Sequence, residues 1–477
     1  MFLGGGSMPI IPTALSMITS YISGVSLLGV PAEIYRRGVL FTLSRLIGAP
    51  VAVLFAIYIL FPIIFSMEPR PTSLYEYLER RFDSNLVRKL ASLLYLLFMI
   101  VYLGIVLYAP AMAMTVGNSV PPWVFFITVG IVCNFYTTTG GLKAVVWADT
   151  LQAGIMYTGI IVLYVKGIVD SGGVKQVVKV AFDQHRLDGL FNYDFNPFQY
   201  LTVWTSVFGG IALFLSHCCF NQISIQRYLS LKSPVEARSM LQISIPGFII
   251  TFLLVDLLGI IIGINSMAAV AWEDFLKFRF NSVSSRGQEW IMKGLTLFFG
   301  FLAIGLAFIA GPLGGIMETA LRIRGGVAGP LIGLFLLGIF VPKATAWDAI
   351  FATSIGSVLM CWIAIGNIIY RPFNDFELPL YTNGCETTNF TLPSNNTFTL
   401  NSMGNTNVTG VAYVYSLSPN FYPAIGAIFV LMIGAFTSLR NWKRQSTQDE
   451  KISRLTIYGV IRQRSSQEEI SMENFKY

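Results

Sequence analysis

Residues 13–29 read TALSMITSYISGVSLLG and lie at the centre of the first long apolar stretch of this chain. Small and hydroxyl-bearing side chains crowd the segment, and prolines flank it at Pro9, Pro12 and Pro31. Glycine, serine and threonine stabilise a helix less than alanine or leucine, so this helix is weak at its middle. The segment therefore decides whether the chain begins with an ordinary membrane helix or with an interrupted one.

Two interpretations of this segment stay open. Ser16, Ser20 and Gly24 repeat at every fourth residue, which is typical of the small-residue seam along which membrane helices pack. Alternatively, the helix unwinds, its carbonyls and hydroxyls coordinate a cation, and the following half-helix points its N-terminus at an anion. Unwound backbone is tolerated only where it lines a cavity. Both interpretations can hold, because they concern different faces.

The composition of the whole chain is that of a membrane protein. Of 477 residues, 54% are hydrophobic and 12% are charged, about half the charged share of a globular domain. Lys and Arg outnumber Asp and Glu by 32 to 25, but the excess lies in short segments between apolar runs, which favours a membrane surface over nucleic acid. Neither a zinc motif nor paired catalytic groups occur at membrane depth, so we expect no enzyme.

The gaps between charges predict about eleven transmembrane helices. A helix needs roughly 20 uncharged residues to cross a bilayer core about 30 Å thick. We expect these helices at 8–32, 46–67, two within 90–142, 150–165, 195–226, 239–264, 294–317, 325–342, 349–370 and 422–439. The transmembrane domain is thus expected over 1–439, and residues 440–477 form a tail expected to be disordered.

Sequons and basic residues predict the orientation. Asn389, Asn395 and Asn407 lie in NFT, NNT and NVT, which are glycosylated only outside the cell or in a lumen. Residues 371–421 are therefore expected to form an extracellular glycosylated loop. Basic residues within 440–444 follow the last helix, and the positive-inside rule places the C-terminus in the cytoplasm. The basic stretch 70–89 and Lys343 are expected on the same side.

When the crossings are counted back from the C-terminus, the expected sides of two consecutive loops disagree with the number of spans between them. Residues 227–238 and 273–289 both carry charges expected in the cytoplasm, yet a single crossing cannot separate two cytoplasmic loops. Either residues 239–272 enter and leave the membrane, or a helix is missing between about Ile264 and Asn265. The stretch is too short for two crossings and a turn, which favours a missing helix.

Few polar side chains are expected at membrane depth. Asp256 stands alone in an apolar run, where a carboxylate costs about 2.5–3.5 kcal/mol, so it is a functional candidate unless the missing helix displaces it. Residues 137–152, TTTGGLKAVVWADTLQ, are expected to form a turn with a double glycine at a helix junction, and Asp149 in it serves either as a helix cap or at an ion exit. His217 is interpreted as a packed polar residue, and glycines 325–329 as a close helix contact. Since we expect no Lys or Arg deep in a span, helix dipoles, hydroxyls and the ion would hold a carboxylate substrate.

Several long motifs follow one another along the chain. They are residues 7–38, TSLYEYLERRF (72–82), IVLYAPAMA (105–113), FYTTTGGLKAVVWADTLQ (135–152), NQISIQRYLS (221–230), INSMAAVAWEDFLK (264–277) and GPLIGLFLLGIF (329–340). With these motifs the chain resembles the sodium/solute symporter family, in its multivitamin and monocarboxylate branch. The similarity covers nearly the whole chain.

The resemblance implies an all-α polytopic fold with a LeuT-like core of two inverted five-helix repeats. It also implies sodium-driven uptake, at the plasma membrane, of small organic anions such as biotin, pantothenate, lipoate or monocarboxylates. The expected partners are therefore sodium as the coupling ion, the organic anion and the lipid bilayer, with no cofactor. The implied sites are the carbonyls of Thr19 and Ile22 for sodium, Ser23, Gly24, Val25, Ser26 and Tyr108 for the substrate, and Asp149 and Gln152 for the ion exit.

The resemblance also reveals a gap. In the family, a run rich in Ser and Thr precedes INSMAAVAWEDFLK and completes the sodium site in the eighth core helix. Here LLGIII (257–262) joins directly to GINSM (263–267), so the first half of that helix is missing where the topology requires a span. We therefore predict a sodium-coupled symporter that is impaired in this chain. The alternative is a non-transporting membrane protein that binds ligand or associates with full-length transporters.

Overall fold

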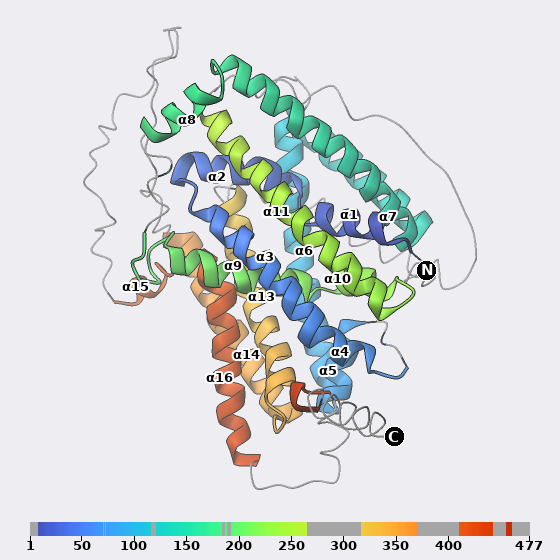
Figure 1. Ribbon diagram of the computed structural model, residues 1–477. Helices are drawn as coiled ribbons and strands as arrows, with labels where there is room; N and C mark the ends of the chain where they lie inside the picture. The colour runs from blue at the N-terminus through green and yellow to red at the C-terminus, as the bar shows by residue number, and fades with distance from the viewer. Residues whose placement is uncertain are drawn as a thin grey trace, which may run out of the picture.

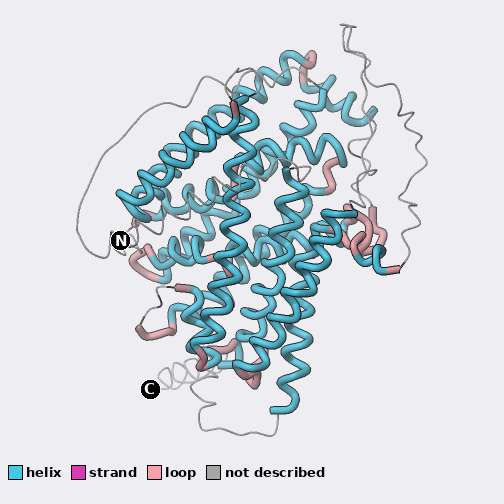
Figure 2. Tube along the Cα trace, turned by 180° about the vertical axis from the view of Figure 1, so that it is seen from behind, coloured by secondary structure: helices cyan, strands magenta, loops and turns pink. Residues whose placement is uncertain are grey.

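A computed structural model describes residues 8–69, 71, 73–115, 121–183, 187, 192–264, 316–370, 410–441 and 455–459. These residues form helices and no strand (Figures 1 and 2). The α-helices are α1 (Ile10–Ser20), α2 (Val30–Arg37), α3 (Phe41–Phe55), α4 (Phe61–Phe65), α5 (Leu74–Phe82), α6 (Asn85–Thr115), α7 (Pro122–Asp170), α8 (Val174–Asp183), α9 (Val203–Cys218), α10 (Gln222–Leu229), α11 (Pro234–Ile264), α13 (Ile316–Phe340), α14 (Ala346–Tyr370), α15 (Val411–Val414) and α16 (Tyr422–Ser438). The π-helices η2 (Val25–Gly29) and η3 (Ala56–Leu60) and the 3-10 helices η7 (Pro419–Phe421) and η8 (Leu439–Asn441) complete them.

Most of the expected spans fall on apolar helices. Six helices are long and apolar enough to cross a membrane, and two bent pairs raise the number to eight. Two shorter apolar helices, Trp123–Cys133 and Gly325–Phe340, match two further expected spans. The expected span at 294–317 lies outside the described residues, so eleven remains a prediction.

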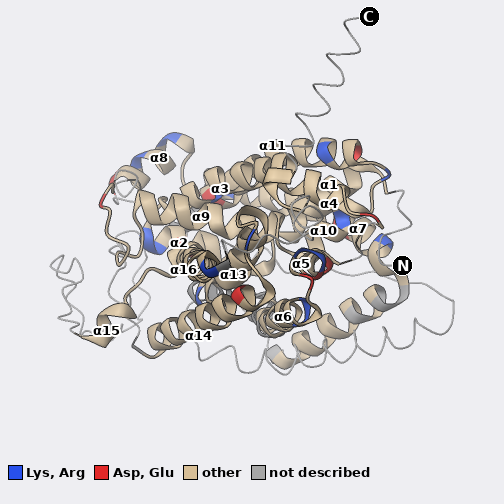
Figure 3. Ribbon diagram, turned by 90° about the horizontal axis from the view of Figure 1, so that it is seen from below, with Lys and Arg blue, Asp and Glu red and all other residues tan. Residues whose placement is uncertain are grey.

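The helix surfaces that face outward are apolar. Most of the helix ribbon is tan, with few Lys, Arg, Asp or Glu positions along it (Figure 3). Trp347 of α14 is 73% exposed, Val358 of the same helix 72%, and Phe436 of α16 76%. Large apolar side chains exposed in this way are suited to contact with lipid.

Glycines set the closest helix contacts. A Cβ atom on Gly210 of α9 would lie 2.1 Å from the carbonyl oxygen of Ser44 in α3, so these two helices touch through their backbones. A Cβ atom on Gly329 of α13 would lie 2.9 Å from the Cα atom of Gly426 in α16. The prediction of close helix packing at 325–329 is thereby confirmed for Gly329.

Three helices are broken at positions that the site uses. α1 stops after Ser20, and the pair formed by Ile10–Ser20 and Val25–Arg37 bends by 53°. α9 and α10 bend by the same angle, between Cys218 and Gln222. Within α7, Gly141 has φ 56° and ψ −153°, a conformation that favours glycine, in the segment for which the sequence predicts a turn.

Segments expected in the cytoplasm gather at one end of the molecule. The Tyr77 hydroxyl of α5 donates to the carbonyl oxygen of Leu455 at 3.1 Å, and burial raises the pKa of Tyr77. Arg81 of the same helix donates to the carbonyl oxygens of residues that end α13, including Gly338 at 2.7 Å and Val341 at 2.6 Å. Residues 455–459 thus lie against α5 (Figure 1). The disorder expected for the tail as a whole remains a prediction.

Candidate functional site

The site is built around the interruption after α1. Residues 21–23 are not helical, and the chain re-enters a helix through η2. The Ile22 amide donates to the Thr19 carbonyl oxygen at 3.0 Å, and the Ser26 amide to the Ser23 carbonyl oxygen at 2.9 Å. The predicted break in the first span is therefore confirmed.

One hydroxyl at this break has no hydrogen-bond partner among the described residues. The Ser23 Oγ atom is buried and makes no hydrogen bond within the described part of the chain. By contrast, the Ser26 hydroxyl donates to the Tyr21 carbonyl oxygen at 3.2 Å. Leaving a buried hydroxyl unpaired costs about 1–3 kcal/mol, so Ser23 is a polar group available to a ligand.

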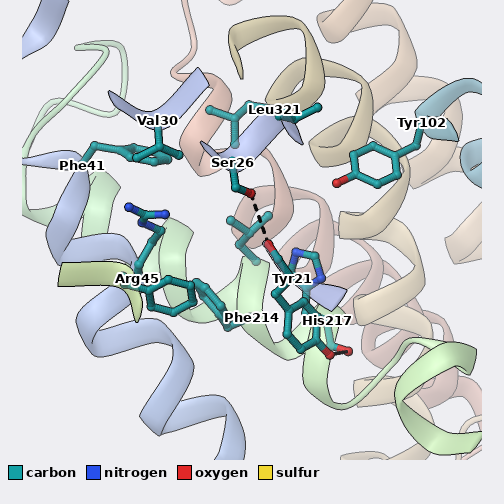
Figure 4. Close-up of a pocket in the computed structure, with 12 residues that line it drawn as sticks. Tyr21, Ser26, Val30, Phe41, Arg45, Tyr102, Phe214, His217 and Leu321 are labelled. Atoms are coloured by element: carbon teal, nitrogen blue, oxygen red, sulfur yellow. Dashed lines mark hydrogen bonds between the residues drawn. The ribbon is translucent and has the colours of Figure 1, made fainter. Parts of the chain in front are cut away.

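A cavity lies beside the break (Figure 4). Val25 and Ser26, two of the predicted substrate residues, line it. The rest of the lining is mainly aromatic and aliphatic: Tyr21, Val30, Phe41, Arg45, Tyr102, Leu213, Phe214, His217, Phe252 and Leu321. Tyr108 lies on α6, as does Tyr102, but its side chain is outside the described residues.

One side chain in the wall of the cavity is cationic, which the sequence did not predict. Arg45 of α3 is 5% exposed and lines the cavity, which corrects the expectation that no Lys or Arg lies deep in a span. Its guanidinium forms an ion pair with Asp256 of α11, which is 3% exposed. Arg45 was overlooked because the charge gap was counted from Leu46, although α3 begins at Phe41.

Aromatic rings enclose the guanidinium of Arg45. Its Cζ atom lies 5.0 Å from the ring centre of Phe252 and 5.9 Å from that of Phe41. Phe252 and Asp256 are one turn apart on α11, so one face of that helix supplies both a ring and a carboxylate. The isolated Asp256 of the sequence is therefore half of a buried ion pair.

A second polar network lies below the break. Arg227 of α10 donates from Nη2 to Asp149 Oδ2 at 2.9 Å and to Ser20 Oγ at 2.5 Å, and from Nε to Ser16 Oγ at 2.9 Å. Ser16 Oγ in turn donates to Asp149 Oδ2 at 2.5 Å. The serines of the predicted seam thus hold α7 and α10 against α1 through hydrogen bonds.

The sequence predicted part of this network. Asp149 belongs to it, whereas Gln152, the other predicted exit residue, is exposed on α7. Arg227 was assigned to a cytoplasmic loop, but it is 2% exposed because the bend after α9 turns α10 back toward α1. The sequence signal that could have identified Arg227 is a basic residue that closely follows an apolar run.

His217 is packed as the sequence predicts, and it also lines the cavity. Its ring meets the Tyr21 ring edge-on, with 4.7 Å between the ring centres, and its carbonyl oxygen accepts from the Tyr21 hydroxyl at 2.8 Å. The Tyr21 hydroxyl also bonds Ser224 Oγ at 2.6 Å. No cluster of His, Cys, Asp and Glu that could hold a metal ion occurs in the part of the chain that the structure describes.

Two groups of predicted features lie outside the described residues. The first comprises the sequons at Asn389, Asn395 and Asn407. The second is the segment that follows α11, which includes residues 265–277 beyond the predicted gap. Both remain predictions.

Comparisons with known proteins identify the class of this protein. The model of the sodium:solute symporter family matches residues 1–274, and the chain belongs to this family. The human sodium-coupled monocarboxylate transporter 1 is 32% identical over 94% of this chain and 83% of its own length. The rabbit sodium-dependent multivitamin transporter is 31% identical over 92% of this chain and 77% of its own length.

A solved structure supports the fold. A Na+-coupled sialic acid symporter in a substrate-bound outward-open state superposes with a TM-score of 0.67 at 19% identity, over 92% of this chain and 91% of that one. The predicted LeuT-like fold is thereby confirmed. The chain is a multi-pass membrane protein of a transporter family, not an enzyme, and the alternative of a non-transporting isoform is not favoured.

Proposed function

We propose that this chain is a sodium-coupled symporter that carries small organic anions, monocarboxylates or vitamin acids such as biotin, into the cell. The names of the monocarboxylate and multivitamin relatives support the substrate class. The observation that carries the proposal is the interrupted first span. Its Ser23 hydroxyl has no partner among the described residues, and Val25 and Ser26, just after the break, line a cavity. Such a break exposes polar backbone to an ion and an anion at membrane depth.

Sodium would bind at the break itself. The Thr19 carbonyl oxygen accepts one hydrogen bond, and a carbonyl oxygen has two lone pairs, so it keeps one for an ion. The Ile22 carbonyl and the Ser23 hydroxyl are the neighbouring oxygens that we assign to the same ion. The substrate would lie beside Ser23, Gly24, Val25 and Ser26, with Tyr108 approaching from α6.

The ion would leave past Asp149. Asp149 accepts hydrogen bonds from Arg227 and Ser16, and these bonds would close the proposed route. Opening it requires α10 to separate from α1 and α7. Gln152, one turn further along α7, would then border the same exit.

We place the protein in the plasma membrane with its C-terminus in the cytoplasm. The hydrogen bond between Tyr77 and Leu455 supports this orientation, because it brings together two segments that are both expected inside. Residues 371–421 would face outward and carry glycans at Asn389, Asn395 and Asn407.

We also propose that coupling is impaired in this chain because part of the eighth core helix is missing. The alignment with the human relative spans 512 positions, while 94% of this chain is about 448 residues, so about 64 positions face gaps in this chain. The family match ends at residue 274, shortly after the proposed gap. A sodium ion shifts a conformational equilibrium only through contacts that differ between the states, and the missing first half of the eighth core helix would supply half of these contacts.

Uptake by proteoliposomes tests both proposals. The 477-residue chain is compared with a version that carries the corresponding segment of the human relative between Ile262 and Gly263. We expect little sodium-dependent uptake of labelled lactate or biotin by the chain as it is, and clear uptake, abolished when choline replaces sodium, by the restored version. Robust uptake by the original chain would contradict the impairment, and no uptake by the restored version would contradict the function.

A further inference from the structure

The buried ion pair of Arg45 and Asp256 has one member at the wall of the cavity. Arg45 lines the cavity, whereas Asp256 lies behind it on α11. A guanidinium presents five N–H donors in a planar fork, so one carboxylate on one edge leaves donors for another. Arg45 is therefore placed to bridge Asp256 and an anion in the cavity.

We propose that Arg45 binds the carboxylate of the substrate, and that Asp256 sets the charge that makes this binding depend on sodium. The inference rests on the proposed function and names the residue that selects the anion. Around Arg45 the cavity is lined by Phe41, Phe214 and Phe252. One cation in an otherwise apolar and aromatic wall suits a monocarboxylate with an apolar tail (Figure 4).

The charge count explains the dependence on sodium. Arg45 and Asp256 together are neutral, so a carboxylate entering alone gives the site a net charge of about −1, which is costly at membrane depth. A sodium ion at the break restores neutrality, and each ligand therefore binds better in the presence of the other. The proposed sodium and anion sites are close because Val25 and Ser26, directly after the break, line the same cavity.

Removing Asp256 tests this account. In the Asp256→Asn variant Arg45 has no buried counter-ion, so a carboxylate that enters the cavity becomes its counter-ion. Binding of labelled butyrate is measured in the purified chain that carries the restored segment, because coupling is proposed to be impaired without it. In this background the Asp256→Asn variant should bind butyrate nearly independently of sodium, about ten- to hundredfold more tightly than its parent in sodium-free buffer. A purely structural ion pair predicts lower stability without a change in sodium dependence.

Removing Arg45 tests its role as the carboxylate ligand. Arg45→Gln leaves Asp256 unpaired and can prevent folding, so the double variant Arg45→Gln with Asp256→Asn, which buries no charge, is measured beside it. Both should bind butyrate about ten- to hundredfold more weakly. The double variant should also lose the preference of the unmodified chain for butyrate over butyramide, which has the same shape without the charge.

A second buried pair gives a matched control. Arg37 Nη1 and Glu33 Oε1 are 3.0 Å apart, their side chains are 4% and 6% exposed, and neither lines the cavity. Arg37→Gln with Glu33→Gln should therefore leave butyrate affinity and its sodium dependence unchanged.

The outcomes separate this inference from the proposed function. Absent sodium-dependent uptake by the restored chain, with butyrate binding to Asp256→Asn retained, would contradict the function and support the anion site. Unchanged butyrate affinity in the double variant, unchanged sodium dependence in Asp256→Asn, or no butyrate binding by any form would overturn the role of Arg45.

Discussion

Arg227 and Asp149 form an ion pair that joins α10 to α7, with 2.9 Å between Nη2 and Oδ2. Ser16 and Ser20 of α1 bind the same guanidinium, so three helices meet at one buried cation. The side chain of Arg227 is 2% exposed and that of Asp149 15%. This arrangement makes the network both a stabilising contact and the closure of the proposed ion exit.

Asp149→Asn should lower the free energy of unfolding by about 3 kcal/mol, because it leaves the buried Arg227 without a counter-ion. The change is read as a lower melting temperature in detergent. Gln152→Ala, on the exposed face of the same helix, should shift stability by less than about 0.5 kcal/mol. Equal effects of the two substitutions would show that the ion pair contributes nothing.

Ser23→Ala should stabilise the ligand-free protein while weakening its response to sodium. The Ser23 hydroxyl is buried without a partner among the described residues, so its removal should raise the free energy of unfolding by about 1 kcal/mol. Melting temperatures are measured with and without sodium in the chain carrying the restored segment. Ser26→Ala, which removes the bond to the Tyr21 carbonyl, should instead destabilise by about 1 kcal/mol. A Ser23→Ala protein that is less stable than the parent would contradict this assignment.

Arg81→Ala should destabilise the protein by about 3 kcal/mol, since Arg81 is 1% exposed and donates to carbonyl groups at the end of α13. Arg81→Lys should recover only part of this loss, because an ammonium cannot reproduce the planar fork. The more exposed neighbour Arg80, whose ion pair is with Glu76, serves as the control, and Arg80→Ala should cost at most about 1 kcal/mol. Urea or thermal unfolding in detergent measures each value.

Gly210→Ala should destabilise by about 1–3 kcal/mol, because its Cβ atom would meet the Ser44 carbonyl oxygen and force α3 and α9 apart. Gly154→Ala, on α7, meets nothing within 4 Å and should instead stabilise by about 0.5–1 kcal/mol. Melting temperatures of the two variants should therefore move in opposite directions. A shift in the same direction would show that the contact is not close-packed.

Local features of the fold were predictable from the sequence, whereas pairings between distant segments were not. The break at residues 21–23 and the turn at Gly141 follow from serine and glycine content, which acts within a few residues. The pairing of Arg45 with Asp256 depends on how α3 packs against α11, and no spacing in the chain encodes it. Arg227 was misplaced because a count of charges cannot detect the bend that carries α10 inward.

The backbone contact between Gly210 of α9 and Ser44 of α3 has a mechanical consequence. Because no side chains separate the two backbones at this point, no side-chain rearrangement can accommodate a sliding of one helix along the other. Arg45 of α3 and Phe214 of α9 lie about one turn from that contact and line the cavity. We therefore expect α3 and α9 to move together as one rigid body when the transporter changes conformation. The alternation of access between the two membrane faces would then require a change at the non-helical residues 21–23.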